Sequence, residues 1–151
     1  MRRMTIGLVC MSLLAGLLAA CAEQPTAVSM APPGQDAAGK QFLPPPAGYA
    51  ALYFYNPTSV GPGLRVIVNG RQIGVLGTQT WMRAEFTRGP HNIRCTGGNS
   101  SNFIEVVLEP GQIRFLDYQM LPGQPVCSVR EAGPDEGRNG VMSGGRAWQG
   151  Q

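Results

Sequence analysis

The sequence predicts an all-β protein: a single antiparallel β-sandwich of about seven to eight strands, with a disordered N-terminal tether and C-terminal tail. Glycine and proline account for 21 and 13 of the 151 residues, and between residues 48 and 130 they interrupt every segment before a helical pattern extends. The runs between them are short and rich in β-branched and aromatic residues, which favours strands. Asn69-Gly70 and Pro110-Gly111 supply turn signals between such runs.

Eight runs are predicted as strands: Tyr49–Tyr55, Leu64–Asn69, Arg71–Leu76, Thr80–Phe86, His91–Thr96, Asn102–Leu108, Gln112–Met120 and Val126–Arg130. Tyr49, Tyr53 and Tyr55 share one face of the first run, and apolar residues fill the other face. This pattern is typical of a central strand covered on both sides, although an aromatic surface for sugars or a partner is the alternative. Trp81 is expected in the core.

Asn69-Gly70 is the two-residue signal for a type I′ hairpin, because both positions require a positive φ. The register that follows has three pairs: Val68 with Arg71, Val66 with Ile73 and Leu64 with Val75. This register places the apolar residues together on one face.

Pro110-Gly111 predicts a second tight turn, with the pairs Leu108–Ile113, Val106–Phe115 and Ile104–Asp117. Glu105 and Arg114 would then lie diagonally on the exposed face and form an ion pair worth at most a few tenths of a kcal/mol. Two hairpins with an apolar face need a covering layer, and with no helix expected that layer is a second sheet.

Residues 1–20 have the layout of a secretory signal peptide. Arg2 and Arg3 precede an apolar run that is too short for a stable span, which needs about 20 apolar residues. Its end, Leu18-Ala19-Ala20-Cys21, resembles the lipobox of bacterial lipoproteins. The resemblance implies that the Cys21 thiol receives a diacylglyceryl group and that Cys21 becomes the first residue. An accidental Ala-Ala-Cys in an ordinary signal peptide is the alternative.

The segments on either side of the strands are predicted to lack structure. Residues 21–47 comprise the lipidated Cys21 and a flexible linker with six prolines and six alanines, which would span roughly 30 Å as a coil or up to about 80 Å if polyproline-like. The β-sandwich domain is placed at 48–130. Residues 131–151 contain six glycines and are predicted as a disordered tail, in which Trp148 is an incidental exposed aromatic or a short docking peptide.

Charge argues against nucleic acid as a partner. Removal of residues 1–20 takes away two arginines and leaves a net charge of +1, without a run of four basic residues. Nucleic-acid binding requires a basic stripe.

Cys95 and Cys127 are the cysteines that remain after Cys21 and the signal-peptide residue Cys10. In an oxidising compartment two such cysteines most simply form a disulfide. Closing a loop of about 30 residues would stabilise the domain by roughly 3–4 kcal/mol. Two separate buried thiols are the alternative.

No catalytic, metal or cofactor site is predicted, and ligand-binding residues remain unknown. His91, the only histidine, follows a turn and is expected to cap a hairpin. A Ser-His-Asp arrangement with Asp117 is formally possible, but no nucleophile motif accompanies it. Glu105 and Asp117 are the nearest carboxylate pair, and the predicted register puts them on opposite faces. Two thiols and one distant histidine lack the spacing of a zinc site.

Four runs of this region form a pattern in chain order: Ala51-Leu-Tyr-Phe-Tyr55, Leu64-Arg-Val-Ile-Val-Asn-Gly-Arg-Gln-Ile-Gly-Val-Leu76, Arg88-Gly89-Pro90-His91-Asn92-Ile93 and Leu108-Glu-Pro-Gly-Gln112. Together these runs resemble a domain of unknown function that is common in bacterial lipoproteins and similar to PEGA-type and prealbumin-like sandwiches. The resemblance covers about residues 48–120, and Pro90 stands where that family usually has a small or basic residue. It implies a fold and an envelope setting and carries over no catalytic residues.

We therefore expect a non-enzymatic lipoprotein of the bacterial outer membrane, with its domain facing the periplasm or the cell surface. Ala22, rather than Asp, after Cys21 implies sorting to that membrane. The expected partners are membrane lipid, through acylated Cys21, and another envelope protein or a cell-wall component. The alternatives are an inhibitor of a hydrolase such as lysozyme, which the lack of an acid in loops 56–63 and 97–101 counts against, and an enzyme acting on cell-wall polymers.

Overall fold

The computed structural model describes residues 28–98, 100–121, 123 and 126–149. The predicted signal peptide and Cys21 lie outside these residues. The elements in chain order are α1 (Pro33–Gly39), β1 (Tyr49–Asn56), β2 (Leu64–Val68), β3 (Arg71–Leu76), β4 (Thr80–Thr87), β5 (Gly89–Gly97), β6 (Ser100–Leu108), β7 (Ile113–Met120), β8 (Cys127–Ala132), α2 (Pro134–Ser143) and β9 (Gly145–Arg146).

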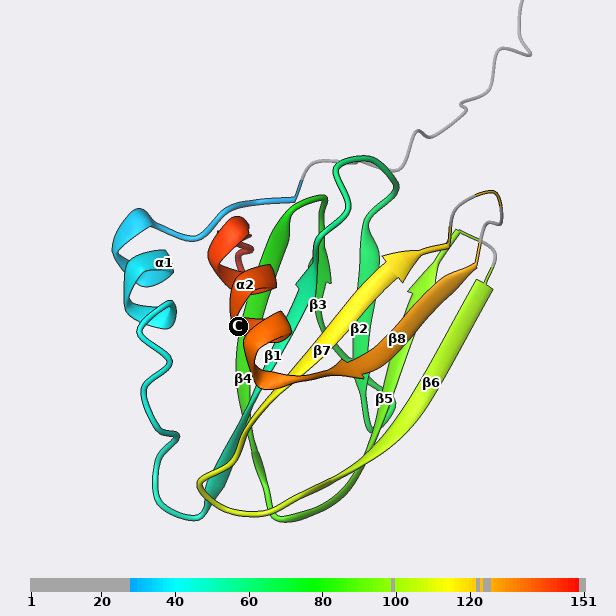
Figure 1. The fold of residues 1–151 in the computed structure, drawn as a ribbon. Coiled ribbons are helices and arrows are strands. Elements are labelled where there is room, and N and C mark those ends of the chain that lie inside the picture. Colours follow the sequence, from blue (N-terminus) through cyan, green and yellow to red (C-terminus); the bar gives the residue numbers. More distant parts are fainter. Residues whose placement is uncertain (1–27, 99, 122, 124–125, 150–151) are drawn as a thin grey trace, which may run out of the picture.

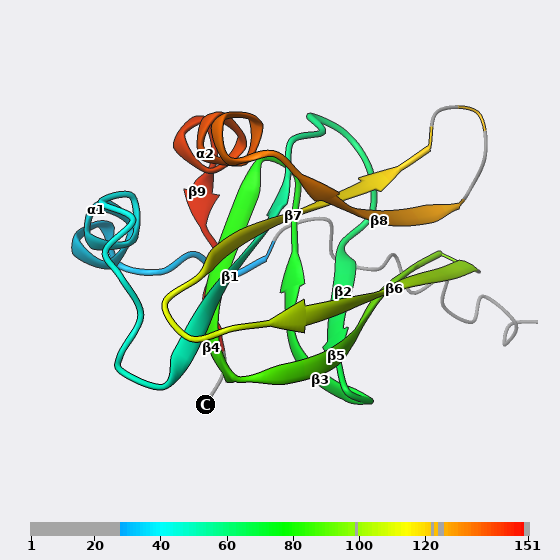
Figure 2. The same ribbon diagram turned by 60° about the horizontal axis from the view of Figure 1, so that its bottom comes forward.

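Two sheets pack face to face, and both helices lie on the outer side of one of them (Figures 1 and 2). The strand orders are β8-β7-β1-β4-β9 and β3-β2-β5-β6. The predicted β-sandwich is confirmed, and the eight predicted strands agree with β1–β8 to within two residues at each end. Pairing is mostly antiparallel, but β1 runs parallel to β7 and β4 runs parallel to β9, which departs from the antiparallel prediction.

Strand β1 lies between β4 and β7 in the middle of the five-stranded sheet. Every residue from Ala50 to Asn56 is buried, so the interpretation of β1 as a strand covered on both sides is confirmed. On its inner face Leu52 and Phe54 contribute to the core between the sheets. On its outer face Tyr53 packs in a second core that also contains the fully buried Trp81, as expected for that tryptophan.

The second core is an aromatic layer between the five-stranded sheet and the helices. The Tyr53 ring lies 5.3 Å from Phe115 and 5.8 Å from Trp81, measured between centroids. Phe42, just after α1, packs on the same cluster at 5.3 Å from Tyr53. This layer explains why an all-β sheet carries helices on one side: its outer face is apolar and has to be covered.

The predictions of a flexible linker at 21–47 and a disordered tail at 131–151 are wrong for the described residues. The first segment contains α1, and the second contains the end of β8, α2 and β9. The glycines that suggested disorder permit close packing instead. A Cβ on Gly39 would overlap the Trp81 ring, and one on Gly140 would overlap the Tyr55 ring. Pro33 and Pro134 begin the two helices, where a missing N–H costs no hydrogen bond.

The predicted register of the β2–β3 hairpin holds only beside its turn. Val68 pairs with Arg71, as predicted, and Asn69 has the expected positive φ of 51°. A bulge follows at Ile73, so Val66 pairs with Gly74 and not with Ile73, and Leu64 pairs with Leu76 and not with Val75. The extra residue lets both Ile73 and Gly74 face the interior, where Ile73 packs against the core.

The predicted hairpin at Pro110-Gly111 is wrong, although the chain does turn there, with φ of 84° at Gly111. Strand β6 pairs with β5, and β7 pairs with β1 and β8, so this turn crosses from one sheet to the other. The pairs predicted between β6 and β7 therefore do not form. The alternation of apolar residues is the same for a hairpin and for a crossover, so the sequence pattern did not distinguish them.

The predicted ion pair between Glu105 and Arg114 also does not form, because β6 and β7 belong to different sheets. Arg114 instead donates two hydrogen bonds to the carboxylate of Glu131 on β8, one of them 2.6 Å long. Tyr118 on β7 is fully buried between the sheets.

Candidate functional site

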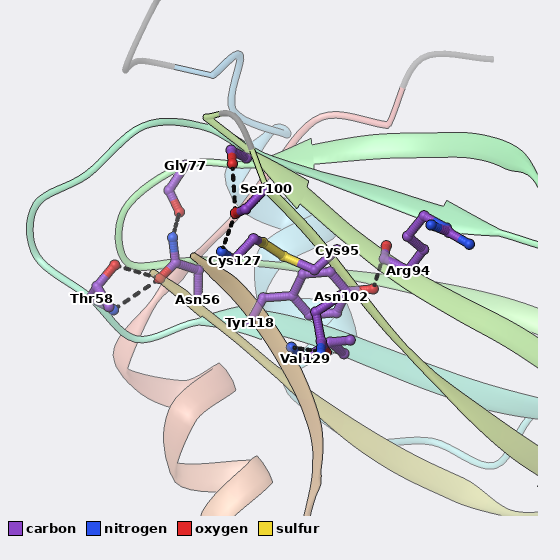
Figure 3. Close-up of a disulfide and its surroundings, with 11 residues drawn as sticks. Asn56, Thr58, Gly77, Arg94, Cys95, Ser100, Asn102, Tyr118, Cys127 and Val129 are labelled. Atoms are coloured by element: carbon purple, nitrogen blue, oxygen red, sulfur yellow. Dashed lines mark hydrogen bonds between the residues drawn. A yellow bond between two sulfur atoms is a disulfide. The ribbon is translucent and has the colours of Figure 1, made fainter. Parts of the chain in front are cut away.

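Cys21, the predicted lipidation residue, lies outside the described residues, so its role stays a prediction. Cys95 and Cys127 form the predicted disulfide, with a Cα–Cα distance of 5.9 Å. Both are fully buried, and because they lie on β5 and β8 the bond joins the two sheets (Figure 3). Nearby, the Tyr118 hydroxyl also links the sheets by donating a 3.3 Å hydrogen bond to the Arg94 carbonyl.

Side chains of β6 complete the closure of the sandwich on this side. Ser100 Oγ accepts a 2.7 Å hydrogen bond from the backbone N–H of Cys127, and Asn102 Oδ1 accepts one of 3.3 Å from the N–H of Val129 (Figure 3). Strand β8 is the edge of its sheet, and free N–H groups on an edge can recruit another strand. The β6 side chains satisfy two of these groups, so this edge is protected within the molecule.

His91 lies at the start of β5 and points into the space between the sheets, with 7% of its surface exposed. Its Nε2 lies 2.8 Å from the Thr87 carbonyl, and its Nδ1 lies 3.0 Å from the Asn69 side-chain nitrogen. A carbonyl only accepts, so Nε2 carries the proton and Nδ1 accepts from the Asn69 amide. Both ring nitrogens are therefore engaged in joining the β2–β3 and β4–β5 turns, a structural role of the kind expected for this residue.

A cluster of polar side chains lies beneath α2. It is formed by Tyr55, Asp117, Gln119, Arg130 and Glu136 and is named here the Asp117 cluster. Asp117 is only 2% exposed. Its Oδ2 accepts hydrogen bonds of 2.6 Å from Gln119 and 2.5 Å from Arg130. Arg130 also pairs with Glu136 on α2. Tyr55 is the register partner of Asp117 on the neighbouring parallel strand.

Burial is the largest influence on Asp117 and raises its pKa, although Gln119 and the charge of Arg130 act to lower it. Burial also raises the pKa of Tyr55, and the nearby carboxylate of Asp117 adds to this effect. Among the described residues, Asp117 Oδ1 and the Tyr55 hydroxyl are buried polar atoms without a hydrogen-bond partner. The cluster therefore contains two buried polar atoms whose loss of hydration no hydrogen bond compensates.

The partners that the sequence suggested for Asp117 do not lie beside it. Glu105 is exposed on β6, in the four-stranded sheet, and His91 faces the inter-sheet core. Asp117 faces α2 on the other side of the five-stranded sheet, with Tyr55. Sequence reasoning missed the Asp117 cluster because it assembles from β1, β7, β8 and α2, and the segment that forms α2 was expected to be disordered.

A second polar centre attaches α1 to the sheet. Asp36 Oδ1 accepts hydrogen bonds from Trp81 Nε1 at 3.1 Å and from the backbone N–H of Arg146 at 2.8 Å, and Lys40 pairs with Oδ2 at 2.9 Å. Burial alone would raise the pKa of Asp36, but these interactions outweigh it and lower the pKa. The Tyr53 hydroxyl adds a 2.8 Å hydrogen bond to the Gly39 carbonyl. Asp36 thus anchors α1 over the aromatic layer.

Two groups of exposed apolar side chains lie at different edges of the sandwich. Phe103 and Val107 project from the outer face of β6, where the Arg94 guanidinium lies 5.3 Å from the centre of the Phe103 ring. Met30 and Trp148 lie beside β9, at the edge of the other sheet. Trp148 is ordered by a backbone hydrogen bond to Ser29 and is half exposed.

Within the described ranges, the structure holds no group of three or more His, Cys, Asp and Glu side chains that could bind a metal ion. Neither helix of the described chain is long and apolar enough to cross a membrane. Comparisons of the chain with protein-family models, curated proteins and solved structures found no match.

Proposed function

We propose that this chain is a lipid-anchored lipoprotein of the bacterial outer membrane whose β-sandwich is a non-enzymatic binding or structural module. The observation that carries the proposal is the Leu18–Cys21 lipobox at the end of an apolar export segment. An acylated Cys21 with two or three chains gives a lasting anchor, whereas a single chain gives a marginal one. The resemblance of residues 48–120 to PEGA-like and prealbumin-like domains of bacterial lipoproteins belongs to the same proposal.

The disulfide between Cys95 and Cys127 supports an extracytoplasmic setting. Structural disulfides persist in oxidising compartments such as the periplasm and are rare in the cytosol. Its place between the two sheets gives it a structural use, because it joins strands that no backbone ladder connects.

The arrangement of His91 and Asp117 supports a non-enzymatic role. A general base needs a ring nitrogen that can reach a substrate proton. Both nitrogens of His91 are engaged with Thr87 and Asn69, and the residue is buried. Asp117 is separated from His91 by the five-stranded sheet, so the two do not form a catalytic pair.

The lipid anchor is tested with Cys21→Ser, and Cys10→Ser is the matched control because Cys10 lies within the predicted signal peptide. We expect the wild type and C10S to fractionate with membranes, with an intact mass that shows loss of residues 1–20 and addition of acyl chains. C21S is expected to leave the membrane fraction. Membrane association of C21S equal to that of the wild type, or an unmodified Cys21, would refute the anchor.

The partner is tested by crosslinking in living cells followed by purification from membranes. Recovery of one envelope protein in constant proportion to the chain supports the binding module. Recovery of lipid and abundant porins alone argues against a specific protein partner. The cell-wall polymer is then the remaining candidate partner, and a pull-down with purified cell-wall material tests it directly.

A further inference from the structure

The described fold includes 20 residues before the predicted domain boundary. The first of them lie at an edge named here the exit edge: residues 28–31 together with Ala147 and Trp148. Met30 and Ala147 form an antiparallel bridge. The N–H of Ala31 donates to the Arg146 carbonyl at 2.9 Å, and the N–H of Trp148 donates to the Ser29 carbonyl at 2.7 Å. Val28 packs against the inter-sheet core. Residues 28–31 are therefore fixed to the sandwich.

This attachment shortens the distance between the fold and Cys21. Seven residue steps separate Cys21 from Val28. A fully extended chain of that length spans at most about 25 Å, against up to about 80 Å for the linker predicted through residue 47. The headgroup layer itself takes up about 5–8 Å of this span. An acylated Cys21 would thus hold the exit edge within a short distance of the lipid surface.

The side chains at the exit edge suit such a surface. Met30 is 51% exposed and Trp148 is 47% exposed, and both lie beside Val28, the described residue nearest to Cys21 in the sequence. Tryptophan prefers the membrane–water interface, because its ring is apolar and its N–H is polar. We propose that the exit edge lies against the membrane surface, with Trp148 and Met30 at the level of the headgroups. This inference rests on the proposed lipidation of Cys21.

The same geometry directs the opposite edge away from the lipid. Strand β3 lies beside β4 near the exit edge, whereas β6 lies beside β8 on the other side of both sheets. Phe103 on β6 is 56% exposed, comparable to Trp148. However, β6 is the edge strand opposite β3 in its sheet, and β3 is the strand of that sheet nearest the exit edge. Phe103 is therefore a matched control for an exposed aromatic that should not meet the membrane.

The test uses the full-length acylated protein, purified from membranes and reconstituted in phosphatidylethanolamine–phosphatidylglycerol vesicles with and without lipids brominated close to the headgroup. Trp81 and Trp148 are the two tryptophans of the chain, and Trp81 is fully buried. Brominated lipid should remove about half of the wild-type emission, since Trp148 is one of two emitters at the interface. Trp148→Phe should lose little of its emission to brominated lipid. The double variant W148F/F103W should be quenched as little as W148F.

The outcomes separate this inference from the proposed function. Acylated, vesicle-bound protein whose Trp148 is not quenched overturns the membrane contact and leaves the lipid anchor standing. Equal quenching of tryptophans at positions 148 and 103 overturns the preferred orientation. Trp148 shielded by a second copy, seen as a dimer in detergent and unquenched in vesicles, also overturns it. Protein with an unmodified Cys21 that does not bind vesicles refutes the anchor and this inference with it.

Discussion

Asp117 is a single buried residue whose charged form destabilises the fold. Its carboxylate is 2% exposed and is held by Arg130 and Gln119 through one oxygen. Burial raises its pKa, so the folded protein binds a proton at this site more readily than the unfolded chain does. Asp36 has the opposite balance, because its hydrogen bonds and Lys40 lower its pKa below the usual value. The two aspartates therefore contribute to stability with opposite dependence on pH.

The difference in free energy of unfolding between Asp117→Asn and the wild type should grow in favour of the variant as pH rises. An acid whose pKa is higher in the folded state binds more protons there, so the wild type loses stability as pH rises from the unfolded pKa, about 3.9, through the folded pKa. Asn stays neutral and removes this loss. Urea unfolding of both proteins between pH 3 and 8 should show nearly equal free energies at pH 3 and an advantage for D117N at pH 7.

Comparison of the two proteins at each pH cancels the contributions of Asp36 and the other shared titrating groups. An advantage of D117N that shrinks as pH rises would mean that the pKa of Asp117 is lowered in the folded state, contrary to the effect of its burial.

At the scale of elements, α1 and α2 depend on the aromatic layer more than on their own sequences. Each is short, and α2 contains Gly137 and Gly140 within its ten residues. Isolated helices of this length are marginal in water, so their stability must come from packing. The two glycines are three residues apart and face the sheet, where Phe115 and Tyr55 occupy the space of their missing side chains.

Gly140→Ala should destabilise the protein even though alanine is the better helix former. The added Cβ would overlap the Tyr55 ring, which belongs to a fully packed strand, and overpacking of this kind costs about 1–3 kcal/mol. Gly34→Ala in α1 is the matched control, because nothing lies within 4 Å of its added Cβ. That change should be neutral or stabilising by about 0.4–1 kcal/mol. Chemical denaturation measures both effects.

A Gly140→Ala protein as stable as Gly34→Ala would show that α2 moves away from Tyr55 without loss, and that its packing is loose. A lower temperature of unfolding in Gly34→Ala would show that α1 tolerates no change and that the comparison does not isolate the ring contact.

Local patterns predicted the elements whose signal lies in adjacent residues. Strands β1–β8 and the turn at Asn69-Gly70 were predicted because alternation and turn residues are read within a few positions. The pairing of β7 and the formation of the two helices depend on residues far along the chain. Strand β7 pairs with β1, and α2 packs against Tyr55 and Phe115. The Asp117 cluster was missed for the same reason, since no short segment contains more than two of its members.

At the scale of the whole molecule, the sandwich is closed differently on its two sides. On one side the first and last described segments meet, as Ser29 and Ala31 pair with Trp148 and Arg146 beside β9. On the other side β6 and β8 face each other without a continuous backbone ladder. Two side-chain hydrogen bonds join these strands, and the disulfide joins β8 to the neighbouring strand β5. Both cysteines are fully buried, and their sulfur atoms meet on this side of the sandwich.

The double variant Cys95→Ala/Cys127→Ala should lower the free energy of unfolding by about 3–4 kcal/mol, because the bond closes a loop across 32 residues and restricts the unfolded chain. Alanine avoids the buried hydroxyl that serine would introduce. Denaturant unfolding of the oxidised wild type and the variant measures the difference, and reducing agent should bring the wild type close to the variant while leaving the variant unchanged. The hydrogen bonds of Ser100, Asn102 and Tyr118 would then remain between the two sheets on this side. Equal stability of the oxidised wild type and the variant would show that these side-chain contacts, and not the disulfide, keep the two sheets together.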